Sequence, residues 1–215
     1  MALRLVDLFS GGGGAAVGYA RAGFEVVGVD IQSQPVYPFA FIQADALTFL
    51  DEGRWRGFDV IHASPPCQAY SMAARLHPGS EANHPDLVGP TRDRLERTGL
   101  PYVIENVDGS PLRGSMVLCG SMFGLRISKH RFFETNWLLP ILAPSACDHR
   151  DLYDPYHGPG RTAAKYREAQ DTPWLPGQGG SGRKRGITGD VSNAVPPAMT
   201  EWIGRQLIQA IEAAA

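Results

Sequence analysis

Short apolar runs alternate with helical patterns along the first half of the chain. Four runs have the length and the flanking turn residues of strands, and they lie at Leu3 to Phe9, Glu25 to Val29, Phe58 to Ala63 and Tyr102 to Ile104. Between them, the small-residue segment Ala15 to Ala22 and the charged segment Pro85 to Thr98 are typical of helices. Strands that alternate with helices predict an α/β fold with a mostly parallel sheet and flanking helices.

The pattern changes in the last third of the chain. From Trp137 to Arg185 proline, glycine, histidine and tyrosine dominate, and we expect an irregular segment. Pro196 to Ala215 then returns to a helical pattern with one broad apolar face. We therefore divide a single domain into a core at 1–136, an irregular segment at 137–190 and a final helix at 191–215 that folds back beside the first strand and the glycine turn.

Composition narrows the classes of protein. The chain has 215 residues, of which 43% are hydrophobic and 20% charged, as in an ordinary globular domain. Neither a secretory signal nor a membrane span is apparent. The three cysteines, at unrelated spacings, suggest no disulfide framework. These features lead us to expect a cytoplasmic protein.

The net charge of −2 argues against a protein coated in basic residues, although it allows a nucleic-acid partner. The densest basic group is Arg183-Lys184-Arg185, in a glycine-rich stretch. It would suit contacts with phosphates, but a solvated, mobile loop is the alternative interpretation.

A glycine run follows the first predicted strand. Gly11 to Gly14 allow a sharp turn and a close approach to a ligand, and the helix that follows offers free N–H groups. Asp30, at the end of the second strand, is placed to accept hydrogen bonds from ribose hydroxyls. The two features suit a cofactor that contains adenosine, whereas the glycine spacing does not match the fingerprint of NAD-binding proteins.

Two side chains at the ends of later strands carry candidate chemistry. Cys67 follows two prolines that stiffen the backbone, and a reactive cysteine must be partly exposed with a lowered pKa. Taken alone, a small buried residue is the commoner role of a cysteine. Glu105 is expected on the same edge of the sheet, where burial would raise its pKa and let it donate a proton. Taken alone, a helix cap or a surface acid would be the preferred interpretation of Glu105.

Taken in order, these motifs resemble those of the cytosine carbon-5 DNA methyltransferases. They are DLFSGGGG, Asp30, SPPCQAYS, ENV at Glu105 to Val107, KHRFF at Lys129 to Phe133 and SNAVPPAM at Ser192 to Met199. The resemblance covers about Leu3 to Thr135 and Gly189 to Leu207. It implies a Rossmann-like methyltransferase fold and methyl transfer from S-adenosylmethionine to carbon 5 of cytosine in DNA. If the DNA is double-stranded, the target cytosine must also be flipped out of the duplex.

The resemblance also implies roles for individual residues. Cys67 would attack carbon 6, Glu105 would protonate ring nitrogen 3, and Arg131 would steady the carbonyl oxygen of the base. The implied cofactor contacts are Phe9 at the adenine, Gly11, Gly12, Gly13 and Gly14 along the methionine part, Asp30 at the ribose and Asp45 near the adenine amine. Further implied cofactor contacts are Ser10, Ile31, Ala46, Pro66, Leu87, Asn193 and Ala194. The implied substrate contacts are Gln68, Ser71, Asn106, Lys129, Arg183, Lys184 and Arg185.

The sequence departs from the family in three places. Lys129 replaces the first arginine of the usual Gln-x-Arg-x-Arg motif and loses its bidentate fork. Ile31 replaces an aromatic residue. Only about Trp137 to Asp190 is available for target recognition, so we expect a compact, phage-like member with relaxed or short sequence specificity.

Several alternatives stay open at this point. The substrate could be RNA or a free cytidine nucleotide, or the protein could bind DNA or cofactor without catalysis. The recognised site, the oligomeric state and a role in restriction-modification are not fixed by the sequence. Cys147 and His149, with His157, supply too few ligands at a convincing spacing, so we expect no bound metal.

Overall fold

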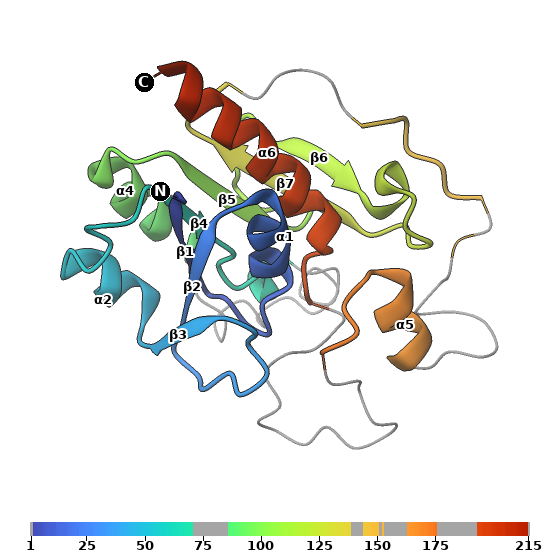
Figure 1. The fold of residues 1–215 in the computed structure, drawn as a ribbon, viewed down its shortest axis with the longest axis horizontal. Helices are drawn as coiled ribbons and strands as arrows, with labels where there is room; N and C mark the ends of the chain where they lie inside the picture. Colours follow the sequence, from blue (N-terminus) through green and yellow to red (C-terminus); the bar gives the residue numbers. More distant parts are fainter. Residues whose placement is uncertain are drawn as a thin grey trace.

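The computed structural model describes residues 2–70, 86–138, 144–150, 152, 163–175 and 193–214. Its centre is a seven-stranded sheet in the order β3-β2-β1-β4-β5-β7-β6 (Figure 1). The strands are β1 (Arg4–Leu8), β2 (Glu25–Asp30), β3 (Ala40–Gln43), β4 (Val60–Ala63), β5 (Tyr102–Asn106), β6 (Met116–Cys119) and β7 (His130–Thr135). The pairs among β1 to β5 are parallel, whereas β7 pairs antiparallel with both β5 and β6. The expected α/β fold with a mostly parallel, Rossmann-like sheet is confirmed.

Helices cover both faces of the sheet (Figure 1). One face carries α1 (Gly14–Ala22) and α6 (Pro197–Ala214), and the other carries α2 (Ala46–Asp51) and α4 (Val88–Thr98). The apolar side chains of β1 divide between these layers, with Leu5 packed toward α1 and α6 and Val6 packed toward α2 and α4. Both side chains are fully buried because alternate residues of a central strand point to opposite faces.

Helix α6 lies directly against α1. A Cβ atom on Gly18 would lie 2.1 Å from Oγ1 of Thr200 and 2.2 Å from the carbonyl oxygen of Pro197. Thr200 in turn donates a hydrogen bond from Oγ1 to the carbonyl oxygen of Ala15, at 2.9 Å. Since α1 begins at the glycine turn, this packing holds the beginning of α6 beside that turn.

The structure contains elements that the hydropathy pattern did not indicate. Strands β3, β6 and β7 and helix α2 belong to them, together with two short 3-10 helices, η1 (Gln68–Tyr70) and η3 (Gly120–Phe123). Helix α5 (Ala163–Ala169) lies inside the segment that was expected to be irregular, and that expectation is wrong for these seven residues. Among the described residues, no helix has both the length and the apolar character needed to cross a bilayer.

Candidate functional site

A pocket of about 510 Å3 opens beside the ends of β1, β2, β4 and β5. Strand order reverses between β1 and β4, which is where open α/β sheets usually bind ligands. Most of the predicted site residues line this pocket. They are Phe9, Ser10, Gly11, Gly12, Gly14, Asp30, Ile31, Pro66, Cys67, Gln68, Glu105, Arg131, Asn193 and Ala194.

Asp30 is fixed to the glycine turn. Its Oδ2 accepts a hydrogen bond from the backbone N–H of Gly11 at 3.0 Å, and its Oδ1 accepts one from the N–H of Gln32 at 2.9 Å. Gly11 has a φ of +48°, and a Cβ atom there would meet nothing within 4 Å. The turn therefore leaves open space beside a carboxylate that still has lone pairs for a ligand.

Four predicted cofactor residues do not line the pocket. Gly13 has a φ of +85° and caps α1, and a Cβ atom on it would lie 2.8 Å from Pro38. Asp45 caps α2, because its Oδ1 accepts the N–H of Thr48 at 2.8 Å. Ala46 and Leu87 lie at the starts of α2 and α4 and are likewise absent from the pocket lining.

Cys67 lies in the loop after β4, and a hydrogen bond from β5 holds this loop in place. The Asn106 side chain donates from Nδ2 to the carbonyl oxygen of Pro65 at 2.9 Å, so the end of β5 holds the proline pair in place. Asn106 itself is buried and does not line the pocket, although it was predicted to contact substrate. Cys67 is partly buried and faces the pocket. This arrangement fixes the loop while leaving the thiol accessible.

The pKa of Cys67 is raised, not lowered as a reactive thiol was expected to require. Burial is the largest cause, and the nearby carboxylate of Glu105 adds to it, while the positive charges of Arg131 and Lys129 oppose it. The expectation of a lowered pKa is therefore wrong for the molecule without a ligand. Any event that neutralises Glu105 would remove one of the two causes.

Glu105 is held by a chain of polar groups. Arg131 Nε lies 2.9 Å from Oε1 of Glu105, and Ser64 hydrogen-bonds the same carboxyl group. His62 Nε2 lies 2.9 Å from the Ser64 hydroxyl, and the Tyr19 hydroxyl lies 3.0 Å from His62 Nδ1. A neutral His62 that accepts from Tyr19 and donates to Ser64 leaves the Ser64 hydroxyl free to donate to Glu105.

The pKa shifts agree with that arrangement. Burial lowers the pKa of His62 to about 3, so its imidazole is neutral. Burial raises the pKa of Glu105, and Arg131, the Ser64 hydrogen bond and Lys129 oppose that rise. Glu105 is thus a buried carboxyl group whose raised pKa favours its protonated form relative to an exposed glutamate.

Sequence reasoning missed Asp7, which looked like a charge interrupting the first strand. It is buried at the pocket, and burial raises its pKa to about 8. Among the described residues, its Oδ1 has no hydrogen-bond partner, and neither has the buried Oγ of Ser10 in the same pocket. The signal available in the sequence was an acid inside an otherwise apolar strand, directly before the glycine turn.

The segment around α5 supplies another wall of the pocket that the sequence did not indicate. Leu175 is fully buried and lines the pocket, and Trp174 donates from Nε1 to the carbonyl oxygen of Gly12 at 3.0 Å. Lys129, predicted to contact substrate, instead donates to the Gln170 side chain at 3.1 Å and to the carbonyl oxygen of Ala194. Lys129 therefore connects β7 to the pocket wall and does not line the pocket itself.

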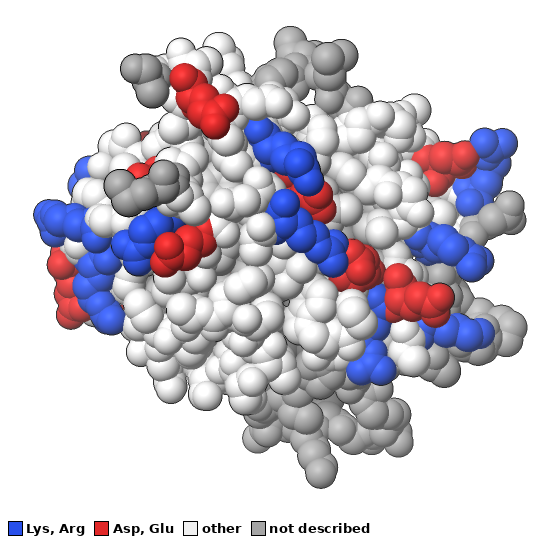
Figure 2. Space-filling view, in the orientation of Figure 1, with Lys and Arg blue, Asp and Glu red and all other residues white. Residues whose placement is uncertain are grey.

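The remaining substrate predictions lie outside the described residues. They are Ser71 and the basic group Arg183, Lys184 and Arg185. On the face shown in Figure 2, basic side chains mostly lie beside acidic ones. This face of the described part of the chain therefore offers no broad basic surface.

The family model of the C-5 cytosine-specific DNA methylases matches residues 3–109. These residues form a domain of that family. The matched range contains the glycine turn, Asp30, Cys67 and Glu105, so the family assignment and the pocket depend on the same residues. Arg131 and the final helix lie beyond the matched range.

Individual proteins are similar to parts of the chain. The Type II methyltransferase M1.HphI of Haemophilus parahaemolyticus is 33% identical over 35% of this chain and 24% of its own. The Entamoeba histolytica methyltransferase EhMeth is 16% identical, with a TM-score of 0.49 over 77% of this chain and 60% of its own. The S. pombe Dnmt2 methyltransferase is 18% identical, with a TM-score of 0.46 over 63% and 49%. The chain thus spans about a quarter of the curated relative and about half to three fifths of these structures.

Proposed function

We propose that this protein transfers a methyl group from S-adenosylmethionine to carbon 5 of cytosine in DNA, with Cys67 as the covalent nucleophile. The observation that carries the proposal is the meeting of Cys67, Glu105 and Arg131 in the pocket that also contains the glycine turn and Asp30. This reaction needs three groups beside the cytosine ring, which are a thiol, a carboxyl group that can carry a proton, and a cation.

The donor groups of the pocket fit the cofactor. Burial favours the protonated form of Asp7 in the pocket, and a ligand that carries an ammonium and a sulfonium charge would favour its carboxylate form. The buried Oδ1 of Asp7 and Oγ of Ser10 have no partner in the part of the chain that the structure describes, so a ligand with polar groups can satisfy them. Asp30 would bind the ribose hydroxyls, and Gly11 would let the ligand approach the backbone.

When bound, the cofactor supplies an electrophilic methyl group, and the chain's own side chains prepare carbon 5 to take it. Attack by the Cys67 thiolate forms a sulfur–carbon bond at carbon 6 and moves an electron pair toward carbon 5. After methylation, loss of the carbon 5 proton to a base returns the electron pair and expels the sulfur. The ring and the free thiolate are thereby restored.

Glu105 couples base binding to activation of the thiol. If Glu105 binds ring nitrogen 3 as the protonated acid, its negative charge no longer raises the pKa of Cys67. Arg131 then acts on the thiolate and the base without an opposing charge beside it. The raised pKa of Cys67 in the free protein is consistent with a thiol that becomes reactive only when cytosine is present.

A methyl-transfer assay tests this function. Tritiated S-adenosylmethionine is offered with duplex DNA, RNA or dCMP, using wild-type protein and the Cys67→Ala variant. We expect label in DNA with wild type and none with the variant. An absence of label in every DNA would overturn the proposal, and label in RNA or dCMP alone would replace its substrate. Bisulfite sequencing of DNA from expressing cells then reports the sequence context, which we expect to be short.

A further inference from the structure

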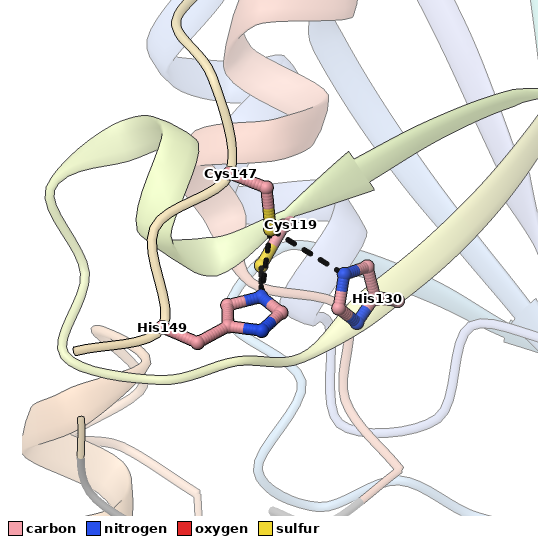
Figure 3. Close-up of side chains that lie close together, drawn as sticks. All are labelled: Cys119, His130, Cys147 and His149. Carbon is pink, nitrogen blue, oxygen red and sulfur yellow. Dashed lines mark hydrogen bonds between the residues drawn. The ribbon is translucent and has the colours of Figure 1, made fainter.

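Four side chains that can bind a metal meet at one end of the β6–β7 pair, outside the pocket. Cys119 ends β6, His130 begins β7, and these two residues are direct partners in the strand register. Cys147 and His149 come from residues 144–150, which lie against them (Figure 3). Three separate parts of the chain therefore contribute to one cluster.

The ligand atoms have the separations of a small coordination shell. All four lie within 4.8 Å of one another. Nε2 of His149 lies 3.4 Å from the sulfur of Cys119 and 2.7 Å from that of Cys147, and Nε2 of His130 lies 3.5 Å from Cys147. Ideal zinc bond lengths place neighbouring sulfur and nitrogen ligands of a tetrahedron about 3.6 Å apart. Only modest adjustment separates the cluster from that geometry.

We propose that Cys119, His130, Cys147 and His149 form a structural zinc site. Two thiolates and two imidazoles are a ligand set that zinc prefers, whereas calcium and magnesium prefer oxygen ligands. The two thiols lose their protons when the ion binds, and the two thiolates balance its double charge. Four protein ligands complete a tetrahedral shell and leave no open position, so the site is structural and not catalytic.

The sequence hid this site because its ligands are far apart along the chain. Cys147 and His149 with His157 supplied too few ligands at a convincing spacing, and His157 lies outside the described residues. The structure adds Cys119 and His130, and Cys119 is 30 residues away from His149. The antiparallel pairing of β6 with β7 brings Cys119 beside His130.

The position of the proposed zinc site in the fold indicates its role. Residues 144–150 contain no helix or strand, so few backbone hydrogen bonds hold them on the sheet. A metal bound to Cys147 and His149 would attach this segment to β6 and β7. His130 also precedes Arg131, whose Nη1 donates to the His130 carbonyl oxygen at 2.9 Å. The ion would therefore also fix the beginning of the strand that brings Arg131 to the pocket.

Metal content of the purified full-length protein tests the proposal. We expect one zinc ion per chain by elemental mass spectrometry. Cobalt should substitute with the visible absorption of a tetrahedral, thiolate-bound ion. Cys147→Ser and His149→Gln should lose the ion, and since both side chains are exposed, the variants should still fold. Asp148 lies between the two ligands in the sequence, and its carboxylate pairs with Arg150. The control variant Asp148→Asn should therefore keep full zinc.

A second measurement reports the attachment of the segment. Trypsin cleaves after arginine, and Arg150 directly follows the ligand His149. Removal of zinc by a chelator should speed cleavage at Arg150 in wild type, and the chelator should have no further effect in Cys147→Ser. A wild-type protein without zinc, ligand variants that keep the ion, or a disulfide between Cys119 and Cys147 in freshly purified protein would each overturn the proposal.

Discussion

Arg131 Nε lies 2.9 Å from Oε1 of Glu105, and both side chains are largely buried. Both side chains face the pocket, so a cytosine that enters the pocket can contact either of them. The pair limits the rise that burial causes in the pKa of Glu105. The protonation of Glu105 is therefore set by a balance that single substitutions can shift.

Ser64→Ala should shift that balance. The Ser64 hydrogen bond lowers the pKa of Glu105, so its loss should raise that pKa further. In the proposed reaction Glu105 acts as an acid, and the activity that depends on its proton should then persist to higher pH. The pH profile of kcat/KM for DNA methylation measures this.

A matched variant separates the hydrogen bond from general damage to the loop. Ser64→Thr keeps the hydroxyl between His62 and Glu105 and should retain the wild-type profile. If Ser64→Ala lowers the rate equally at every pH, the hydrogen bond does not control the protonation of Glu105.

Asp7 should make stability depend on pH. Burial raises its pKa from 3.8 to about 8, so the folded state favours the protonated acid. Its stabilising contribution is complete below pH 3.8 and is lost as the pH rises to about 8. Relative to Asp7→Asn, the wild type should therefore lose free energy of unfolding across this window. Urea denaturation at several pH values measures the difference, and parallel curves for the two proteins would contradict the assignment.

Gly18→Ala should separate α6 from α1. The added methyl would lie 2.2 Å from the carbonyl oxygen of Pro197, and this backbone cannot move without moving the helix. Overpacking of this kind costs about 1–3 kcal/mol or more. The matched control is Gly89→Ala in α4, where a Cβ atom meets nothing within 4 Å. This substitution should raise the free energy of unfolding by up to about 1 kcal/mol, because alanine favours the helix more than glycine does. Equal free energies of unfolding for the two variants would be inconsistent with the observed packing.

The central part of the fold could be predicted because its periodicity is strong. Strands β1, β2, β4 and β5 consist mostly of apolar residues, and the pocket residues gather at the edge where these parallel strands end. Strands β6 and β7 were not predicted. MVLC in β6 is only four residues long, and HRFFET in β7 mixes polar and apolar residues, several of them partly exposed.

Contacts between distant segments account for the parts of the site that were missed. Leu175 reaches the pocket because the segment after α5 packs on the glycine turn, through a hydrogen bond that joins residues 162 positions apart. The family resemblance places the Asp45 carboxylate near the adenine, but in the structure this carboxylate caps α2 by accepting the N–H of Thr48. No pattern within one segment reports such long-range packing, and a motif match does not report which way a side chain is held.

The most direct test of the account is a trapping experiment with DNA that contains 5-fluorocytosine. Fluorine at carbon 5 cannot leave as a proton does, so the sulfur–carbon bond to Cys67 should persist after methyl transfer. We predict a covalent protein–DNA adduct that requires S-adenosylmethionine, forms with wild type and Cys147→Ser, and fails with Cys67→Ser. An adduct that survives Cys67→Ser, or a wild-type protein that methylates DNA but forms no adduct, would contradict the assignment of Cys67 as the nucleophile.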